Sequence, residues 1–295
     1  MFVTDKPYPS LDADGGGFQK NEFRDFNVDI NNKELNCNQS EGLSPKISVI
    51  TVCLNAEEFI EQCIQSVLAQ GFDDVEYVII DGGSTDGTVT TIEKYQDKIT
   101  YWHSRPDRGL AHAFNLGVEH SSGQWLLFLN SDDYFDSSNV LQDMAVHLDN
   151  YATADVVFGQ VVVMTREQAA RKIGGPYGRE FQWAEFCRKD TIPHQAAFSS
   201  RVFFERIGPF SERFRIAVDY EHFLRAGPKL KVEFVPVLVA NMRDGGLSRH
   251  NVLASLREWS SAQVVSGNRS KFFAQLTYAY YAVRSVVGTA WRKLS

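Results

Sequence analysis

Two apolar runs near the start of the chain decide the fold: Ile47-Ser-Val-Ile-Thr-Val-Cys-Leu54 and Glu76-Tyr-Val-Ile-Ile-Asp81. Both are short, rich in β-branched residues and almost continuously apolar, which is typical of strands buried on both faces of a sheet. Between them, residues 60–68 carry apolar side chains at helical spacing. Asn55 is predicted to cap this helix, with Glu58 as its capping-box partner.

The same alternation continues along the first half of the chain. Further strands are predicted at residues 99–103 and 125–129, with a helix at residues 110–119 between them. Alternating buried strands and helices indicate an α/β fold with a mostly parallel sheet covered on both faces. Beyond Asn130 the predicted strands and helices no longer alternate regularly. We expect an α+β half that shares the same sheet. Its predicted strands are residues 155–164 and 231–239, and its short helices are residues 201–207 and 219–226.

Composition divides the chain into three parts. Residues 1–45 are rich in Asp, Asn, Gly and Ser, and we interpret them as a flexible acidic N-terminal leader. The alternative is an arm that docks as a lid or binds a partner. Residues 46–250 are predicted to form the α/β domain, with halves at 46–133 and 134–250. Residues 251–295 are expected to be a helical C-terminal extension.

Charge and hydropathy exclude several classes of protein. The 295 residues carry a formal net charge of −7, which argues against a nucleic-acid binder. No apolar run of 18 residues predicts a membrane span, and the first residues do not resemble a signal peptide. The four cysteines form no C-x-x-C pair, so we expect reduced thiols and a cytoplasmic location.

Polar side chains follow four consecutive predicted strands. Asn55, Asp81, the segment 105–109 and the pair Asp132-Asp133 all stand at carboxyl ends, where open parallel sheets bind ligands. Taken singly, Asp81 suits a turn and the Asp pair suits a helix cap. Taken together, they predict a binding site. The Gly-rich segment after Asp81 matches neither a phosphate-binding P-loop nor a dinucleotide-binding fingerprint.

An ordered set of segments resembles family 2 glycosyltransferases of the GT-A fold, in particular those that build bacterial surface polysaccharides. The resemblance covers about residues 46–250. It implies an inverting, metal-dependent enzyme that moves a single sugar from a nucleotide-diphosphate sugar, UDP being favoured, to a glycan or lipid-linked acceptor. The matching segments are Ser48–Ala56, Asp81–Thr88, Pro106–Gly109, Phe128–Asp133, Pro193–Ala196, Gly208–Phe210 and Val218–Arg225.

The resemblance also implies a role for each candidate residue on the donor side. Asp81 resembles the acid that accepts a hydrogen bond from the N3–H of uracil. Thr51 and Val52 resemble the strand-end residues against which the nucleoside packs. The remaining candidates for nucleotide-sugar binding are Asn55, Arg108 and Asp132.

A divalent cation would reconcile an acidic chain with an anionic diphosphate, because it neutralises charge on the leaving group. The resemblance implies Mn²⁺ or Mg²⁺ held by Asp133 directly, while Asp132 reaches the ribose or a water near the metal. Asn130 departs from the family pattern, in which many members carry an acid.

Asp219 resembles the catalytic base of the family. An inverting transfer needs one carboxylate to take the proton of the acceptor hydroxyl. The structural alternative for Asp219 is an acid favoured at a helix N-terminus. His194, Gln195 and Glu221 are expected on the acceptor side. The Gln-x-x-Arg-Trp motif of processive synthases is absent, which favours transfer of single sugars.

Two other functions remain open at this point. One is a non-catalytic relative that acts as a binding or assembly subunit. The other, a sugar-nucleotide nucleotidyltransferase, would need a Gly-rich basic loop after the first strand, which this sequence lacks.

The C-terminal segment 269–295 contains five basic and no acidic residues. Its apolar residues at helical spacing predict either contact with the inner face of an anionic membrane or packing on the core. They are Phe272, Leu276, Val283, Val287 and Trp291.

Overall fold

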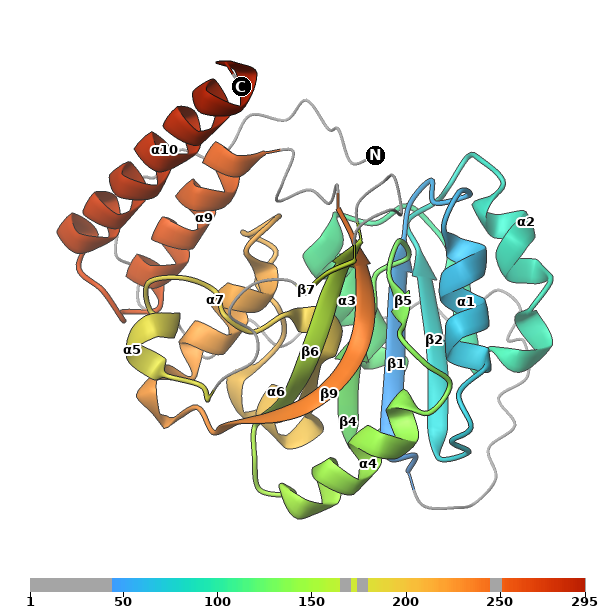
Figure 1. Ribbon diagram of the computed structural model, residues 1–295. Helices are drawn as coiled ribbons and strands as arrows, with labels where there is room; N and C mark the ends of the chain where they lie inside the picture. The colour runs from blue at the N-terminus through green and yellow to red at the C-terminus, as the bar shows by residue number, and fades with distance from the viewer. Residues whose placement is uncertain (1–43, 165–170, 174–179, 245–250, 295) are drawn as a thin grey trace. The chain divides into compact units, whose positions relative to one another are not determined.

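A nine-stranded mixed sheet organises the chain in the computed structural model (Figure 1). The structure describes residues 44–164, 171–173, 180–244 and 251–294, with side chains of the last helix described as far as Arg284. The strands are β1 (Ile47–Cys53), β2 (Val75–Asp81), β3 (Tyr101–Ser104), β4 (Trp125–Phe128), β5 (Tyr134–Phe135), β6 (Val156–Met164), β7 (Arg171–Ile173), β8 (Ala197–Ser200) and β9 (Val232–Arg243). The helices are α1 (Ile60–Leu68), α2 (Thr88–Glu93), α3 (Leu110–Glu119), α4 (Val140–Asn150), α5 (Trp183–Phe186), α6 (Arg201–Ile207), α7 (Val218–Arg225), α9 (Val252–Val265) and α10 (Lys271–Leu294), with single 3₁₀ turns η1 (Gln96–Lys98), η2 (His194–Ala196) and η3 (Gly227–Lys229).

The first four strands form the parallel part of the sheet, as the sequence predicts. Their order is β3-β2-β1-β4, and each neighbouring pair is parallel. Every residue of β1 is buried. A strand with apolar or small side chains on both faces needs cover on both, and the crossover helices provide it.

Alternate side chains of the central strands enter two separate cores. On one face, Val49 packs in a cluster with the apolar sides of α1 and α4. On the other face, Ile50 packs in a cluster with α3, α6 and α7. Gly117 of α3 lies against Ile50 so closely that an added Cβ would stand 2.3 Å from its methyl group. The helix can therefore approach the sheet closely only with glycine there.

The second half of the chain extends the same sheet, which confirms the expectation of a shared sheet. β8 runs antiparallel to β4 and to β6, and β9 runs parallel to β6. The strand predicted at 231–239 continues to Arg243, because its last residues pair with β5 and β6. These pairs bring Asn241 and Arg243 next to the loop after β4.

Residues 43–295 form one compact unit. The predicted leader, residues 1–45, lies outside the described residues apart from its last two positions. Among the residues that are described, no helix is long and apolar enough to cross a membrane. Cys53, Cys63 and Cys187 are buried free thiols.

The predicted capping box at Asn55 is wrong. Helix α1 begins at Ile60, after a cap residue without a side-chain hydrogen bond. Asn55 adopts a left-handed backbone conformation with φ +51°, and its side-chain oxygen accepts a hydrogen bond from the Thr85 N–H at 2.9 Å. Its side chain thus ties the loop after β1 to the loop after β2 instead of capping the helix.

Candidate active site

The carboxyl ends of β1, β2, β3 and β4 lie along one edge of the sheet, as parallel pairing requires (Figure 1). The turn η2 precedes β8, which pairs with β4 on the side opposite β1. The edge therefore has two sides. The predicted nucleotide-binding residues lie towards β1 and β2, and the predicted acceptor residues lie towards η2 and α7.

Asp81, at the end of β2, is completely buried and holds the following loop together. One carboxylate oxygen accepts hydrogen bonds from the Gly83 N–H (3.1 Å), the Ser84 N–H (2.8 Å) and the Ser104 hydroxyl (2.6 Å). The other accepts from the Ser84 hydroxyl at 2.5 Å and lies 3.4 Å from the Cys53 thiol. Asp81 therefore holds the loop after β2 in place, and the nucleobase contact that the resemblance implies for it stays a prediction.

The pair Asp132 and Asp133 follows β4. Asp133 is 2% exposed, and one of its oxygens accepts a hydrogen bond from the Arg243 N–H at 3.1 Å. Burial, with the charge of Asp132 adding to it, raises the pKa of Asp133 to about 8. Asp132 is only partly buried, and burial also raises its pKa. Two adjacent carboxylates whose ionisation is suppressed in this way favour a bound cation.

Asp219 meets His194 beside this pair. In the first turn of α7, an Asp219 carboxylate oxygen lies 2.9 Å from His194 Nδ1, and the two side chains are 16% and 24% exposed. His194 Nε2 lies 3.0 Å from the Asn130 amide nitrogen. Burial alone would lower the pKa of His194, but the hydrogen bond and charge of Asp219, together with Asp133 and Asp190, raise it. The imidazole thus links the end of β4 to the start of α7.

Asp190 is a further acid at this site that sequence analysis did not single out. Burial and the charge of Asp219 raise its pKa well above the ordinary value. One of its oxygens accepts a hydrogen bond from the Ile192 N–H at 3.1 Å. In the sequence, only its position shortly before Pro193-His194 indicates that Asp190 could lie at the site.

Arg243 was also missed, since nothing near it in sequence points to the site. Its guanidinium lies over the rings of Phe59 (4.8 Å) and Tyr134 (5.5 Å). It also donates a hydrogen bond to the side chain of Gln62. The long strand β9 alone brings this cation to the carboxylate pair.

Several predicted site residues have other partners. The Thr51 hydroxyl is buried and bonded to the Tyr77 hydroxyl at 3.1 Å, so its side chain belongs to the core. Val52 is 5% exposed and packs in the opposite core cluster. Arg108 forms two hydrogen bonds, at 2.7 and 2.8 Å, to the carboxylate of Glu212. Its expected contact with phosphates would have to compete with this ion pair.

The three residues predicted on the acceptor side have different partners. Gln195 is 5% exposed, and its amide nitrogen lies 3.2 Å from the Met242 sulfur. Glu221 is 1% exposed and forms an ion pair with Arg225 at 3.1 Å. Glu221 therefore stabilises α7 through Arg225, and a role on the acceptor side stays a prediction. His194 alone of the three contacts the proposed base.

Glu258 of α9 fixes the start of α7. One of its carboxylate oxygens accepts hydrogen bonds from the N–H groups of Arg215 (3.0 Å), Ile216 (2.8 Å) and Ala217 (2.9 Å). Asp219 follows two residues later, so an acid in the C-terminal extension determines where the proposed base lies.

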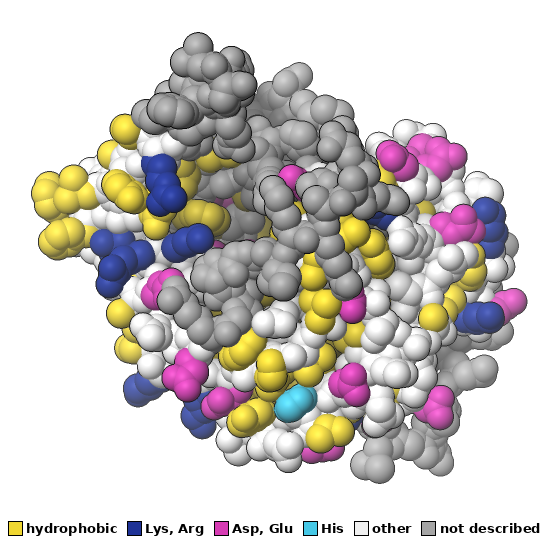
Figure 2. Space-filling view, in the orientation of Figure 1, with side chains coloured by type: hydrophobic (Ala, Val, Ile, Leu, Met, Phe, Trp, Pro, Cys, Tyr) yellow, Lys and Arg dark blue, Asp and Glu magenta, His cyan; other side chains and the backbone are white. Residues whose placement is uncertain are grey.

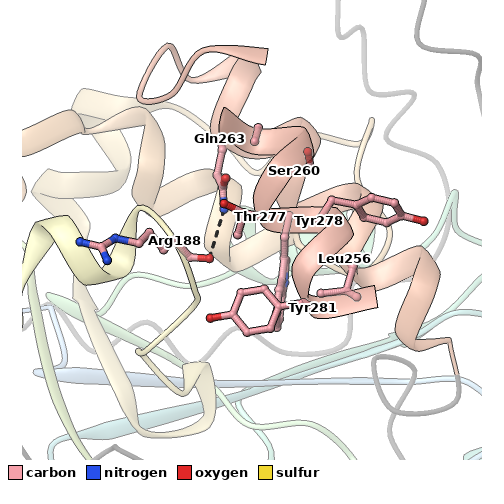
Figure 3. A pocket seen from close by; sticks show the side chains of 9 residues that line it. Arg188, Leu256, Ser260, Gln263, Thr277, Tyr278 and Tyr281 are labelled. Carbon is pink, nitrogen blue, oxygen red and sulfur yellow. Dashed lines mark hydrogen bonds between the residues drawn. The ribbon is translucent and has the colours of Figure 1, made fainter. Parts of the chain in front are cut away.

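A pocket between α9 and α10 is separate from this site (Figure 3). It is lined by Trp259 and Gln263 of α9 and by Tyr278 and Tyr281 of α10, among others. The Gln263 amide donates to the Arg188 carbonyl at 3.4 Å and to the Tyr220 hydroxyl at 3.1 Å. The Gln263 side chain thus joins α9 to α7 and to the segment after α5, and not to the ends of the strands.

A nucleotide-diphosphate-sugar transferase fold with acids at these strand ends is typical of glycosyltransferases, and comparison with known proteins agrees. The model of the family described as "Glycosyl transferase family 2" matches residues 48–206. The chain belongs to this family, and it is a glycosyltransferase of the GT-A fold.

Relatives with related names support the same assignment. The chain is 31% identical over 211 residues to a PGL/p-HBAD biosynthesis glycosyltransferase of Mycobacterium bovis, covering 70% of this chain and 80% of the relative. It is 28% identical over 187 residues to the chondroitin synthase of Pasteurella multocida, covering 61% of this chain but 19% of that protein.

Solved structures share the fold. TarS 1–349 of S. aureus in complex with UDP-GlcNAc matches with a TM-score of 0.60 and 18% identity, over 80% of this chain and 71% of that one. The mannosyltransferase PcManGT of Pyrobaculum calidifontis, in complex with GDP-Man and Mn²⁺, matches with a TM-score of 0.58 and 16% identity, over 83% and 76%. At these identities the likeness shows the fold alone.

Proposed function

We propose that the chain is an inverting glycosyltransferase that moves one sugar from a nucleotide-diphosphate sugar to an acceptor hydroxyl during glycan assembly. The observation that carries this proposal is the chain of contacts from Asn130 through His194 to Asp219. It joins the end of β4, where Asp132 and Asp133 stand, to a carboxylate on the other side of the same edge. An acid for the acceptor and a pair of acids for the donor therefore share one site.

Asp219 acts as the general base. It takes the proton of the acceptor hydroxyl while that oxygen attacks the anomeric carbon and the bond to the diphosphate breaks. One carboxylate suffices, because a single direct displacement inverts the anomeric centre without a covalent sugar–enzyme intermediate. His194 holds the carboxylate in place through Nδ1, and Asn130 fixes the other side of the imidazole.

The residues after β4 fit a divalent cation, Mn²⁺ or Mg²⁺. Asp132 and Asp133 would hold it, and a bound cation would oppose the effect of burial, which raises the pKa of both. Within the described segments, no group of three or more His, Cys, Asp or Glu is arranged as a complete metal site. This suits a cation that takes its other ligands from substrate phosphates and water. The ion would neutralise charge on the departing diphosphate.

The donor is proposed to be a UDP-sugar. Support comes from the fold shared with TarS, whose complexes contain UDP-GlcNAc and UDP, whereas PcManGT was solved with GDP-Man. The mycobacterial relative is named for PGL/p-HBAD biosynthesis and the Pasteurella relative for chondroitin synthesis, and we propose a glycan or lipid-linked acceptor, as the family resemblance implies. A non-catalytic role is the alternative, and the combination of Asp219, Asp132 and Asp133 in one site argues against it.

Binding of the donor can be tested by the thermal stability of the protein in a panel of nucleotide sugars with Mn²⁺ or with EDTA. A donor at one hundred times its Kd stabilises the native state by about 2.7 kcal/mol. We expect UDP-sugars to raise the melting temperature only when the metal is present. A complete lack of response to every nucleotide sugar would contradict the proposal.

We also propose that α10 brings the enzyme to the inner, cytoplasmic face of a membrane. One face of this helix is apolar and exposed: Phe272 (65%), Phe273 (55%), Leu276 (52%), Tyr280 (60%) and Val283 (63%). The opposite face contacts α9 through Ala274, which is fully buried.

Charge favours an anionic lipid surface as the partner of this face. Lys271 and Arg284 are exposed on α10, and segment 269–295 has no acid. Figure 2 shows Lys and Arg side chains beside the hydrophobic ones on this side of the molecule. Each base near such a surface contributes about 1 kcal/mol, which supports reversible binding. Of the predicted stripe, Val287 and Trp291 lie outside the described side chains.

A further inference from the structure

A groove lies between the segment after α5 and helix α10, and none of the residues given a role in sugar transfer lines it. It has a volume of about 360 Å³ and is lined by Gln182, Ala184, Glu185, Arg188, Lys189 and Tyr281. Arg188 and Tyr281 also line the small pocket between α9 and α10, so the groove and that pocket adjoin (Figure 3).

Positive charge predominates in this groove. Arg188 and Lys189 line it together with one acid, Glu185. Arg188 is exposed, and its Nε donates a hydrogen bond to the Ala184 carbonyl at 3.1 Å. That bond engages only Nε, so among the described residues the two terminal nitrogens of the guanidinium remain for an anionic ligand.

Arg269 adds a third cation close by. Its guanidinium donates a hydrogen bond at 2.7 Å to the hydroxyl of Thr277, and Thr277 lines the adjoining pocket. The charges of Arg269 and Arg188 both oppose the effect of burial, which raises the pKa of the Cys187 thiol. Cations from the segment after α5 and from the residues just before α10 therefore act on the same part of the molecule.

The groove runs beside the exposed apolar face of α10. Thr277 and Tyr281, one helical turn apart, face the pocket and the groove. Phe273, Leu276 and Tyr280, at helical spacing, form the neighbouring stripe and are 55%, 52% and 60% exposed. A lipid bound here can place its phosphate among the basic side chains and its hydrocarbon chains along this stripe.

The segment that lines the groove continues to the acceptor side of the candidate active site. Lys189 lines the groove, and the next residue, Asp190, lies near Asp219, whose charge raises the pKa of Asp190. Neighbouring Cα atoms stand about 3.8 Å apart. A headgroup in the groove would therefore lie close to the proposed base, a position that suits a lipid-linked acceptor.

We propose that this groove binds the phosphate group of a membrane lipid at the acceptor side of the site. Arg188 and Lys189 donate charge-assisted hydrogen bonds to the phosphate oxygens, a contact for which the guanidinium fork is well shaped. The inference rests on the proposed function and deepens it, because it names the headgroup that the membrane contact of α10 would bring to the enzyme.

The test is co-sedimentation of the full chain with two kinds of phosphatidylcholine vesicle, adjusted to equal surface charge. One kind carries phosphatidic acid, whose headgroup is a phosphate, and the other carries cholesteryl hemisuccinate, whose headgroup is a carboxylate. A hydrogen bond to a charged group corresponds to about a 10–100-fold difference in affinity, so we expect the wild type to bind the phosphatidic acid vesicles about tenfold tighter. In Arg188→Gln the difference should fall to within about threefold.

Lys98→Gln is the matched control, because it removes one exposed cation from η1, beyond α2. This variant should keep the wild-type difference between the two kinds of vesicle. Lys189 is left unchanged, since its charge also acts on Asp190 near the proposed base. Equal binding of the wild type to both kinds of vesicle, or an Arg188→Gln variant that keeps the difference, would overturn the inference.

Inorganic phosphate distinguishes a lipid from the free anion. Measured by calorimetry, it should bind more weakly than the phosphatidic acid vesicles, because it lacks the hydrocarbon chains. Equal affinity would overturn the assignment to a lipid. Binding to neither kind of vesicle would overturn both this inference and the membrane contact of α10. Thermal stabilisation by a nucleotide sugar does not depend on the groove, so it tests the proposed transferase separately.

Discussion

The Nδ1 atom of His194 lies 2.9 Å from a carboxylate oxygen of Asp219, although 25 residues separate the two in the chain. The imidazole is held from the other side by Asn130, the residue that replaces the first acid of the family's metal motif. In this chain the end of β4 is therefore tied to the proposed base through hydrogen bonds. The amide of Asn130 thus contacts the imidazole at the position where many family members carry an acid.

Replacing the base should affect turnover and leave donor binding intact. We expect Asp219→Asn to lower kcat by roughly 10²–10⁴, the usual contribution of a general base. The amide keeps the size of the side chain and can still bond to His194. Donor Kd, measured by calorimetry, should change little. A variant whose kcat stays within about threefold of the wild type would show that another residue is the base.

Removing the proposed metal ligands should weaken the response to Mn²⁺. Asp132→Asn and Asp133→Asn should each raise the half-saturating Mn²⁺ concentration by at least about tenfold, since even the partners of metal ligands contribute that much. Donor release measured over a Mn²⁺ titration provides the readout. Asp143→Asn on α4, away from the site, is the control. Full activity of the wild type in excess EDTA would contradict a metal-dependent mechanism.

Glu258 should support both stability and catalysis. Glu258→Gln removes the charge that three N–H groups before α7 share, and hydrogen bonds to charged groups contribute about 1.5–3 kcal/mol. We expect urea unfolding to show a loss of about that size. We also expect kcat to fall while the KM for the donor stays, because α7 carries the base and not the donor site.

The control for this experiment is Glu205→Gln, an exposed acid on α6. Exposed substitutions of this kind change stability by about 0.5 kcal/mol or less. If Glu258→Gln loses stability but keeps kcat, Glu258 stabilises the fold without positioning Asp219.

The apolar face of α10 should determine membrane binding. We expect the triple variant Phe272→Ser, Leu276→Ser, Val283→Ser to lose co-sedimentation with anionic vesicles at low salt. These side chains are already exposed, so the melting temperature should change little. Val202→Ser is the matched control, because Val202 is 67% exposed on α6. Equal sedimentation of the triple variant and the wild type would exclude this face as the membrane contact.

Sequence reasoning predicts the central strands well because local composition decides them. The β-branched runs of β1 and β2 could hardly form anything but buried strands, and the polar residues after them mark the binding edge. Sequence reasoning cannot find contacts with distant partners. The side chain of Asn55 accepts a hydrogen bond from Thr85, 30 residues later. Arg108 forms an ion pair with Glu212, which lies 104 residues later. Neither partner can be found from spacing along the chain.

The same limit explains the residues that were missed. Arg243 reaches Asp133 only because β9 is longer than its apolar run and pairs with β5 and β6. The resemblance implies a nucleobase contact for Asp81, but its hydrogen bond with Ser104 of the next strand cannot be found from spacing along the chain. The order of the motifs predicts which edge of the sheet binds ligands. Contacts between distant residues decide which carboxylates at that edge are already hydrogen-bonded within the protein.

The most direct test of the central claim is the stereochemistry of donor hydrolysis, which needs no knowledge of the acceptor. Proton NMR can follow the first sugar anomer released from an α-linked UDP-sugar by the protein with Mn²⁺. The account predicts that the β-anomer appears first, that EDTA abolishes its release, and that Asp219→Asn slows it strongly. Initial release of the α-anomer, or release at an equal rate by Asp219→Asn, would contradict an inverting transfer with Asp219 as the base.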